Sequence, residues 1–322
     1  MKGFFSLWML DIKRLLKNSL FIVISVTLVL IIIVTLFLLP KDIQMEEHEL
    51  VTFGMSEYGF DEVESMDLLY DAVDNGSIGI YLNEDNMPVI VHNGISDRNL
   101  NAIAVMVFSK GFTQIESLKL YEDQQPIPFN QRMVPVFIAF EALIVGLILV
   151  GALMLAEKEE STLLALRISP IGVNLYILSK TTLLALIGTV YSLLMAITCV
   201  GFNYNFLSLI AISFFGSCIF ILLGMAFSVF FKTLGEWFFS IAIILMVNMM
   251  PVMSYMMPSY SPGWIKLTPS YYILFELEKI LFKQPGQILP VILSMGTWLL
   301  VSYVITYQFI RIFYLKRGGR NA

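Results

Sequence analysis

The sequence predicts an all-α polytopic membrane protein with six transmembrane helices, an N-terminal interfacial helix and a small α+β extracytoplasmic insertion. Three observations predict this class. Hydrophobic residues make up 57% of the 322 residues and charged residues only 14%, whereas soluble domains carry about 25% charged residues. Six apolar runs are long enough to cross a bilayer. One long acidic segment separates the first two of these runs.

Residues 1–18 are expected to form an interfacial amphipathic helix. Apolar residues recur at helical spacing from Phe4 to Leu16, and the polar side carries Lys2, Lys13, Arg14 and Lys17. A basic amphipathic helix with aromatic anchors lies in the membrane surface. The next run, 19–40, continues to Pro40 without a small-residue cleavage pattern. It is therefore expected to be the first span rather than a signal peptide.

The six spans are expected at about 19–39, 133–156, 175–200, 207–231, 237–257 and 288–313. The last five form one segment, 133–322, after the acidic insertion. Lysine and arginine residues precede the first span and follow the last, which predicts a cell-membrane protein with both termini and residues 156–170 in the cytoplasm. The outer loop 258–287 also carries lysines, so we expect it to fold back onto the membrane with Trp264, Tyr271 and Tyr272 at the interface.

Residues 41–132 are expected to form a small α+β domain outside the cell. The segment has 17 acidic and 5 basic residues, a net charge of −12, while the whole chain has −5. Periodicity predicts a helix over 61–74, strands over 78–82 and 89–92, and a helix that Ser96 or Asp97 caps and that runs to Phe108. The segment contains no cysteine and no Asp-x-Asp-x-Asp loop. Its acidity is therefore read as solubility rather than as a cation site.

The segment 156–170 is charged at its start, with Glu157, Lys158, Glu159 and Glu160 in a row. Acidic residues in a first turn favour helix formation. The leucines that follow supply an apolar edge, and Pro170 ends the segment. Two interpretations are open: a solvated connector between two spans, or a docking surface for a cytoplasmic protein.

This segment, EKEESTLLALRISP followed by Lys180, resembles the cytoplasmic coupling segment of ABC-2 type transporter permeases. The family pattern is acidic-basic-acidic, Gly-Thr, a leucine-rich run, Ser or Thr before Pro, and Lys about ten residues on. Ser161 stands where the family usually has glycine. The coupling residues that the resemblance implies are Glu157, Lys158, Glu159, Glu160, Ser161, Thr162, Leu163, Leu166 and Pro170.

The resemblance also implies partners. ATP and Mg²⁺ would bind a separate ABC ATPase subunit, and one six-span chain would need a second copy or a paralogue to complete a pathway. We expect Glu157, Glu159 and Glu160 to pair with basic groups of the ATPase, while Leu163 and Leu166 fill an apolar groove. Membrane lipids are the remaining partner, and no nucleic acid is expected.

Motifs of catalysis are missing from the sequence. It has no G-x-x-x-x-G-K-[ST] phosphate loop, and Ser179-Lys180-Thr181 lacks the glycines that surround a phosphate. No HExxH or GxSxG sequence occurs, and the two histidines have no partner at ligand spacing. The chain is therefore expected to be no enzyme and to bind neither a cofactor nor a metal.

Four residues inside the spans are candidates for a substrate pathway: Glu141, Asn248, Met249 and Met253. Glu141 lies about 12 Å into the second span, where an ionisable group is costly and by default functional. The alternative is a protonated Glu141 bonded to a neighbouring helix. Asn248 lies in a cluster of methionines, which suit promiscuous apolar surfaces but also serve as ordinary packing residues.

The resemblance favours a permease that exports a hydrophobic or amphipathic compound, a drug or an antimicrobial. Export of a lipid or lipopeptide is the near alternative. An alternative of another class is a membrane sensor whose outer domain binds a ligand and whose segment 156–170 recruits a cytoplasmic protein.

Overall fold

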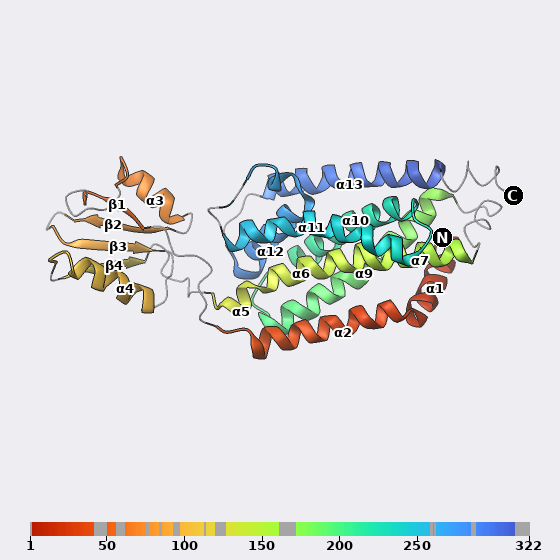
Figure 1. Cartoon of the computed structure of the whole chain (residues 1–322), viewed down its shortest axis with the longest axis horizontal. Coiled ribbons are helices and arrows are strands. Elements are labelled where there is room, and N and C mark those ends of the chain that lie inside the picture. The colour runs from red at the N-terminus through yellow and green to blue at the C-terminus, as the bar shows by residue number, and fades with distance from the viewer. Residues whose placement is uncertain are drawn as a thin grey trace. The chain divides into compact units, whose positions relative to one another are not determined.

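The computed structural model describes residues 2–41, 50–55, 62–74, 77–83, 86–92, 97–112, 114–119, 127–160, 172–257, 260, 262–284 and 288–312. The chain divides into two compact units (Figure 1). One unit is helical and comprises Met1–Ile43 and Phe129–Ala322, and the other is Gln44–Pro128.

Six helical stretches of the described residues are long and apolar enough to cross a membrane. They are Ser19–Leu38, Phe129–Glu159, Val173–Cys199, Phe206–Ser228, Leu234–Met256 and Leu289–Ile310. These bounds follow the six predicted runs within a few residues. The prediction of a mostly helical chain with six candidate spans and a small sheet is thus confirmed.

The first two helices meet at Asn18. Helix α1 (Lys2–Lys17) ends there, and α2 (Ser19–Ile33) begins with the Asn18 side chain accepting a hydrogen bond from the Leu20 amide at 2.9 Å. Asparagine is a favoured N-cap because its oxygen satisfies a first-turn amide. A short π-helix, η1 (Val34–Leu38), completes the first span. The cap allows α1 to leave the direction of α2, and Figure 1 shows the two helices at an angle.

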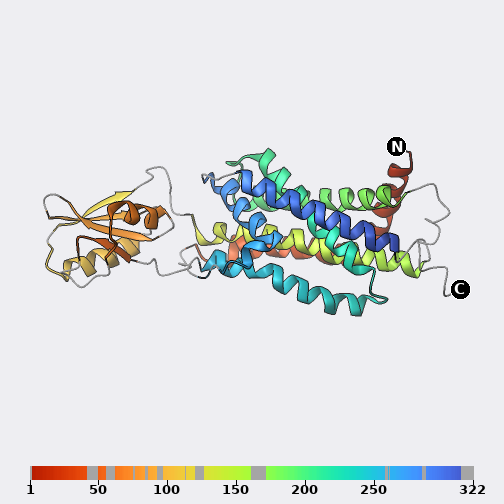
Figure 2. The ribbon, with the colours of Figure 1, turned by 90° about the horizontal axis from the view of Figure 1, so that it is seen from above.

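The second span is built from four pieces. These are α5 (Phe129–Arg132), α6 (Val134–Leu143), the π-helix η3 (Ile144–Leu149) and α7 (Val150–Glu159). The other long helices are α9 (Val173–Cys199), α10 (Phe206–Ser228), α11 (Leu234–Met256) and α13 (Ile288–Ile310). Helix α10 packs against α9, α13 and η3, so it forms the centre of the helical unit (Figures 1 and 2).

Glycines bring α10 and η3 close together. A Cβ added at Gly224 would lie 2.6 Å from Val150 and 3.0 Å from the carbonyl oxygen of Gly146. A Cβ added at Gly146 would lie 2.7 Å from Cβ of Phe220. Small residues let the backbones of membrane helices approach each other. Larger side chains at either glycine would separate the second span from the central helix.

The loop 258–287 contains a regular helix that the sequence analysis described only as a fold-back onto the membrane. Helix α12 (Pro269–Phe282) follows the short 3-10 helix η4 (Ile265–Leu267) and packs against α10, α11 and α6. Its buried face carries Ile273, Leu274, Leu277 and Leu281. Fourteen residues are too few for a span, so hydropathy over a span-length window passes over this helix.

The second unit contains a four-stranded sheet in the order β1-β2-β3-β4. Its elements are β1 (Leu50–Phe53), α3 (Met66–Asp74), β2 (Ile78–Leu82), β3 (Pro88–His92), α4 (Asp97–Phe108) and β4 (Glu116–Lys119). Strands β1 and β2 are parallel, β2 and β3 antiparallel, and β3 and β4 parallel. The unit therefore consists of two β-α-β segments joined by a hairpin.

Each face of the sheet is covered by one helix. Leu69 and Val73 of α3 pack with Val89 and Val91 on one face, whereas Val107 of α4 packs with the cluster on the other face. Sequence analysis predicted β2, most of β3 and the course of α4. The predicted helix begins five residues before α3. Both edge strands were missed, because β1 and β4 are only four residues long.

Candidate functional site

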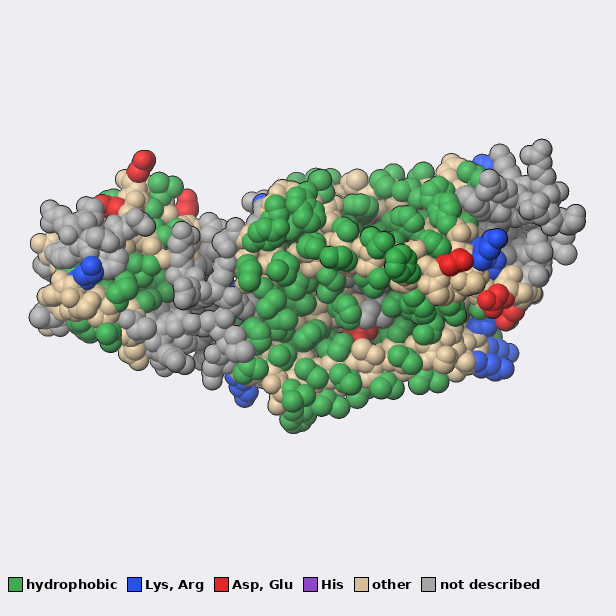
Figure 3. Space-filling view, in the orientation of Figure 1, with side chains coloured by type: hydrophobic (Ala, Val, Ile, Leu, Met, Phe, Trp, Pro, Cys, Tyr) green, Lys and Arg blue, Asp and Glu red, His purple; other side chains and the backbone are tan. Residues whose placement is uncertain are grey.

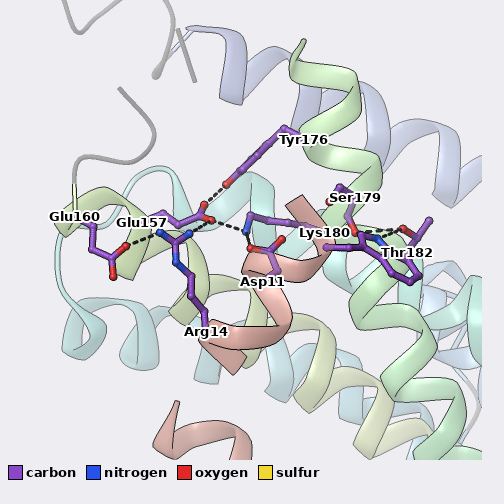
Figure 4. A network of polar contacts seen from close by, with 9 residues as sticks. Asp11, Arg14, Glu157, Glu160, Tyr176, Ser179, Lys180 and Thr182 are labelled. Atoms are coloured by element: carbon purple, nitrogen blue, oxygen red, sulfur yellow. Dashed lines mark hydrogen bonds and ion pairs between the residues drawn. The ribbon is translucent and has the colours of Figure 1, made fainter. Parts of the chain in front are cut away.

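A network of charged and polar side chains joins α1, the end of α7 and the start of α9 (Figure 4). Its six members are Asp11, Arg14, Glu157, Glu160, Tyr176 and Lys180. We call this set the polar network. It lies at the end of the helical unit where charged side chains gather, while apolar side chains cover the spans (Figure 3). The two helix ends that flank the predicted coupling segment both contribute to it.

Lys180 is the buried centre of the polar network. Lys180 is 1% exposed, and its ammonium donates to Asp11 Oδ1 at 2.8 Å and to Glu157 Oε1 at 2.7 Å. The ammonium also lies 5.1 Å from the centre of the Tyr176 ring, within the range of a cation–π contact. A lysine on α9 thus holds α1 and α7 together through two carboxylates.

Glu157 is buried as well, and both of its oxygens are hydrogen-bonded. Oε1 accepts from Lys180 and, at 2.7 Å, from Arg14, while Oε2 accepts from the Tyr176 hydroxyl at 2.6 Å. Burying a charged pair costs desolvation energy, which is offset only when the remaining hydrogen-bonding capacity is filled. Here three donors from two helices fill it, so the carboxylate is held in one position.

Arg14 extends the polar network to the surface. One nitrogen of its guanidinium donates to Glu157, and the other donates to Glu160 at 2.5 Å. The side chain of Glu160 is 54% exposed, compared with 4% for that of Glu157. The network therefore runs from a buried lysine to an exposed glutamate directly before residue 161.

Helix α1 has a second attachment to α9. The indole N–H of Trp8 donates to the Ser179 carbonyl at 3.0 Å and to the Thr182 hydroxyl at 3.3 Å. Asp11, one turn further along α1, is buried against Lys180. Burial raises the pKa of Asp11, and the neighbouring ammonium of Lys180 opposes part of that shift. One side of α1 is thus fixed to the spans by polar groups.

The acidic start of the coupling segment has divided roles. Glu157 is buried and bonded to Arg14, Tyr176 and Lys180, and its expected pairing with an ATPase stays a prediction. Lys158 donates to the carbonyls of Val229 at 3.0 Å and Phe231 at 2.7 Å, so it caps the end of α10. Glu159 and Glu160 are exposed. The other coupling residues, Ser161, Thr162, Leu163, Leu166 and Pro170, lie outside the described residues, and their role stays a prediction.

The candidate pathway residues are not gathered at one place. Glu141 is fully buried on α6, and neither carboxylate oxygen has a hydrogen-bond partner within the described residues. Asn248 is also buried: its amide donates to the Ile244 carbonyl, and its oxygen accepts from Ser270 of α12. Met249 is half-buried, and Met253 is 46% exposed. Asn248 thus holds α12 against α11, so its geometry fits packing better than substrate contact.

Sequence reasoning missed Asp11, Tyr176 and Lys180 as members of one site. Lys180 was considered only as part of an incomplete phosphate loop and as the last position of the family pattern. A lysine inside a predicted span is itself a signal of buried acidic partners, because such charges are almost always paired. The pairing with α1 spans 169 positions, and no local pattern could have located it.

No cluster of three or more histidine, cysteine or acidic side chains suited to a metal ion occurs in the part of the chain that the structure describes. Within the polar network, Glu157 accepts hydrogen bonds on both oxygens, Asp11 accepts one from Lys180, and Glu160 accepts one from Arg14. The arrangement ties α1, α7 and α9 together.

Comparison with known proteins gives two relatives. The chain is 28% identical over 128 residues to the fluoroquinolones export permease proteins of two Mycobacterium tuberculosis strains, CDC 1551 and H37Rv. The match covers 39% of this chain and spans about half, 54%, of the length of each relative. No protein-family model matches the chain. Both relatives are named export permeases, which agrees with the resemblance of this chain to a transporter permease.

Proposed function

We propose that the chain is the membrane permease of an ATP-driven exporter, and that the polar network transmits movement of an ATPase subunit to the spans. The exported compound would be a hydrophobic or amphipathic drug or antimicrobial. The similarity to fluoroquinolone export permeases supports this class of compound. In this proposal ATP and Mg²⁺ bind the ATPase subunit, and a second permease chain completes the pathway.

One observation carries the proposal: the polar network ties both ends of the connection 161–171 to α1. Glu157 and Glu160 stand before the connection, Tyr176 and Lys180 follow it, and Asp11 and Arg14 reach both sides from α1. A push on the connection would therefore move α1, α7 and α9 together. Rigid elements joined by charged hydrogen bonds can carry such coupling between sites.

Glu159 is the residue best placed to meet the ATPase. It is exposed, and within the described residues its side chain takes part in no ion pair. Charges at the rim of an interface mainly set orientation and association rate. Leu163 and Leu166, if buried at the centre of the contact, would each contribute about 1–3 kcal/mol.

The proposal is tested by ATP-dependent uptake of norfloxacin into inverted membrane vesicles from the source organism. Vesicles with the tagged wild-type chain should accumulate the drug when ATP is present. The Glu159→Lys variant should be inserted at the wild-type level and lose most of this uptake, whereas the exposed control Glu236→Lys on α11 should keep it. Uptake that is independent of the chain would refute the exporter, and would favour the sensor alternative. Normal uptake by Glu159→Lys would refute the contact.

A further inference from the structure

We infer that Glu141 binds the basic group of an organic cation, so that hydrophobic amines are a substrate class of this permease. The inference rests on the proposed export function and names a ligand for a residue that the polar network does not use. Glu141 lies on α6, in the middle of the second span, whereas Glu157 of the polar network lies near the end of that span.

Within the described residues, the Glu141 carboxyl has no hydrogen-bond partner for either its ionised or its neutral form. Glu141 is 0% exposed, and neither Oε1 nor Oε2 has a hydrogen-bond partner within the described residues. An ionised carboxylate needs a cation or several donors when it is buried, and a neutral carboxyl needs an acceptor for its proton. Glu157 is also buried, but its two oxygens accept three hydrogen bonds.

The span that carries Glu141 packs against two other helices. Helix α6 packs against α9, and α2 contacts both α9 and η3, the turn that follows Glu141. The Tyr191 hydroxyl of α9 lies 2.5 Å from that of Ser25 on α2. Helix α2 is the least enclosed of these helices: 17% of the residues in its most apolar 18-residue stretch are buried, compared with 56% for α9. In this inference, α2 is the helix that is displaced when the ligand enters.

The backbone next to Glu141 leaves the regular α-helical form. The π-helix η3 begins at Ile144, within one turn of the glutamate. Such wide turns are rare and occur frequently at functional sites. The segment is held in place by its close approach to α10 at Gly146. The carboxyl is thus presented from a fixed, irregular point of the span.

The chemistry of the site selects an organic cation. A bare metal ion needs several oxygen ligands, typically about six for Mg²⁺ or Ca²⁺, and the described residues offer no acidic cluster here. A protonated amine needs one carboxylate for a short, charge-assisted hydrogen bond. Phe137 and Ile138 lie one turn before Glu141 on the same side of α6 and suit the hydrocarbon part of such a ligand.

The test uses the full-length chain in lipid nanodiscs and two matched fluorescent probes: dansylcadaverine, a primary amine, and its uncharged N-acetyl derivative. Wild-type protein should bind the amine on the order of tenfold more tightly than the acetylated probe. Glu141→Gln should abolish this preference without weakening binding of the acetylated probe. The control Glu236→Gln, which removes an exposed acid from α11, should retain it. An equal preference in Glu141→Gln and wild type would overturn the inference.

A second measurement needs no variant and remains decisive if Glu141→Gln fails to fold. Dicyclohexylcarbodiimide reacts with carboxyl groups in apolar surroundings, and mass spectrometry locates the product. Wild-type protein should be labelled at Glu141. The N,N-dimethyl derivative of dansylcadaverine, a tertiary amine that does not couple to a carbodiimide-activated carboxyl, should protect the residue, and the acetylated probe should give no protection. Labelling that both probes leave unchanged would contradict the inference. Norfloxacin uptake into inverted vesicles that carry the same wild-type chain keeps this outcome separate from failure of the export function.

Discussion

The ammonium of Lys180 lies 2.8 Å from the carboxylate of Asp11, although the two residues are 169 positions apart. This pair joins an N-terminal helix to the start of the third span. Glu157, from the end of the second span, shares the same ammonium. Three helices on the predicted cytoplasmic side therefore depend on one buried lysine, and the account of coupling depends on their moving together.

Replacing Lys180 with methionine should strongly destabilise the helical unit. The substitution keeps an unbranched side chain, one atom shorter, but leaves Asp11 and Glu157 buried without their shared cation. Removing one partner of a buried ion pair costs about 3–5 kcal/mol. The free energy of unfolding in detergent, compared with that of the exposed control Lys266→Met, measures the loss. A Lys180→Met protein as stable as the control would show that the pair contributes little.

Gly151→Ala should destabilise the contact between α7 and α11. A Cβ at this position would overlap the indole of Trp237, which is fully buried. Overpacking of this kind costs about 1–3 kcal/mol. Gly235→Ala on α11 is the matched control, because a Cβ there meets nothing within 4 Å. Thermal unfolding should separate the two variants, and equal midpoints would mean that Trp237 moves aside easily.

The proposed topology places α4 outside the cell and Glu159 inside. Single cysteines at Lys110 and Glu159, in a chain with Cys199→Ala and Cys218→Ala, make this testable. A membrane-impermeant maleimide added to intact cells should modify the Lys110→Cys protein and spare Glu159→Cys until the cells are opened. Modification of Glu159→Cys in intact cells would reverse the orientation and remove the basis of the coupling proposal.

Sequence patterns located the spans because each one is apolar over its whole length, and this signal is local. They also located β2 and α4, where hydrophobic periodicity is clear. Patterns could not locate the partners of Glu157, since Arg14 and Lys180 reach it only after the helices pack. Glu157 was therefore assigned to the surface, although the structure buries it.

Helix α12 and the strands β1 and β4 show a different limit. Each is short, and its residues become ordered through neighbours rather than through their own pattern. Asn248 illustrates the consequence for function: in the sequence it is an isolated polar residue in a span, but in the structure its oxygen accepts a hydrogen bond from Ser270 of α12. Glu141, in contrast, remains without such a partner among the described residues.

The most direct test of coupling compares Arg14→Gln with Lys13→Gln. Both changes remove one positive charge from α1, but only Arg14 connects Glu157 with Glu160. Trp8 and Asp11 still attach α1 to α9 in either variant. The quantity to measure is norfloxacin transported per ATP hydrolysed in inverted vesicles. The account predicts a wild-type ratio for Lys13→Gln and a severalfold lower ratio for Arg14→Gln at equal ATPase binding. Equal ratios for the two variants would contradict it.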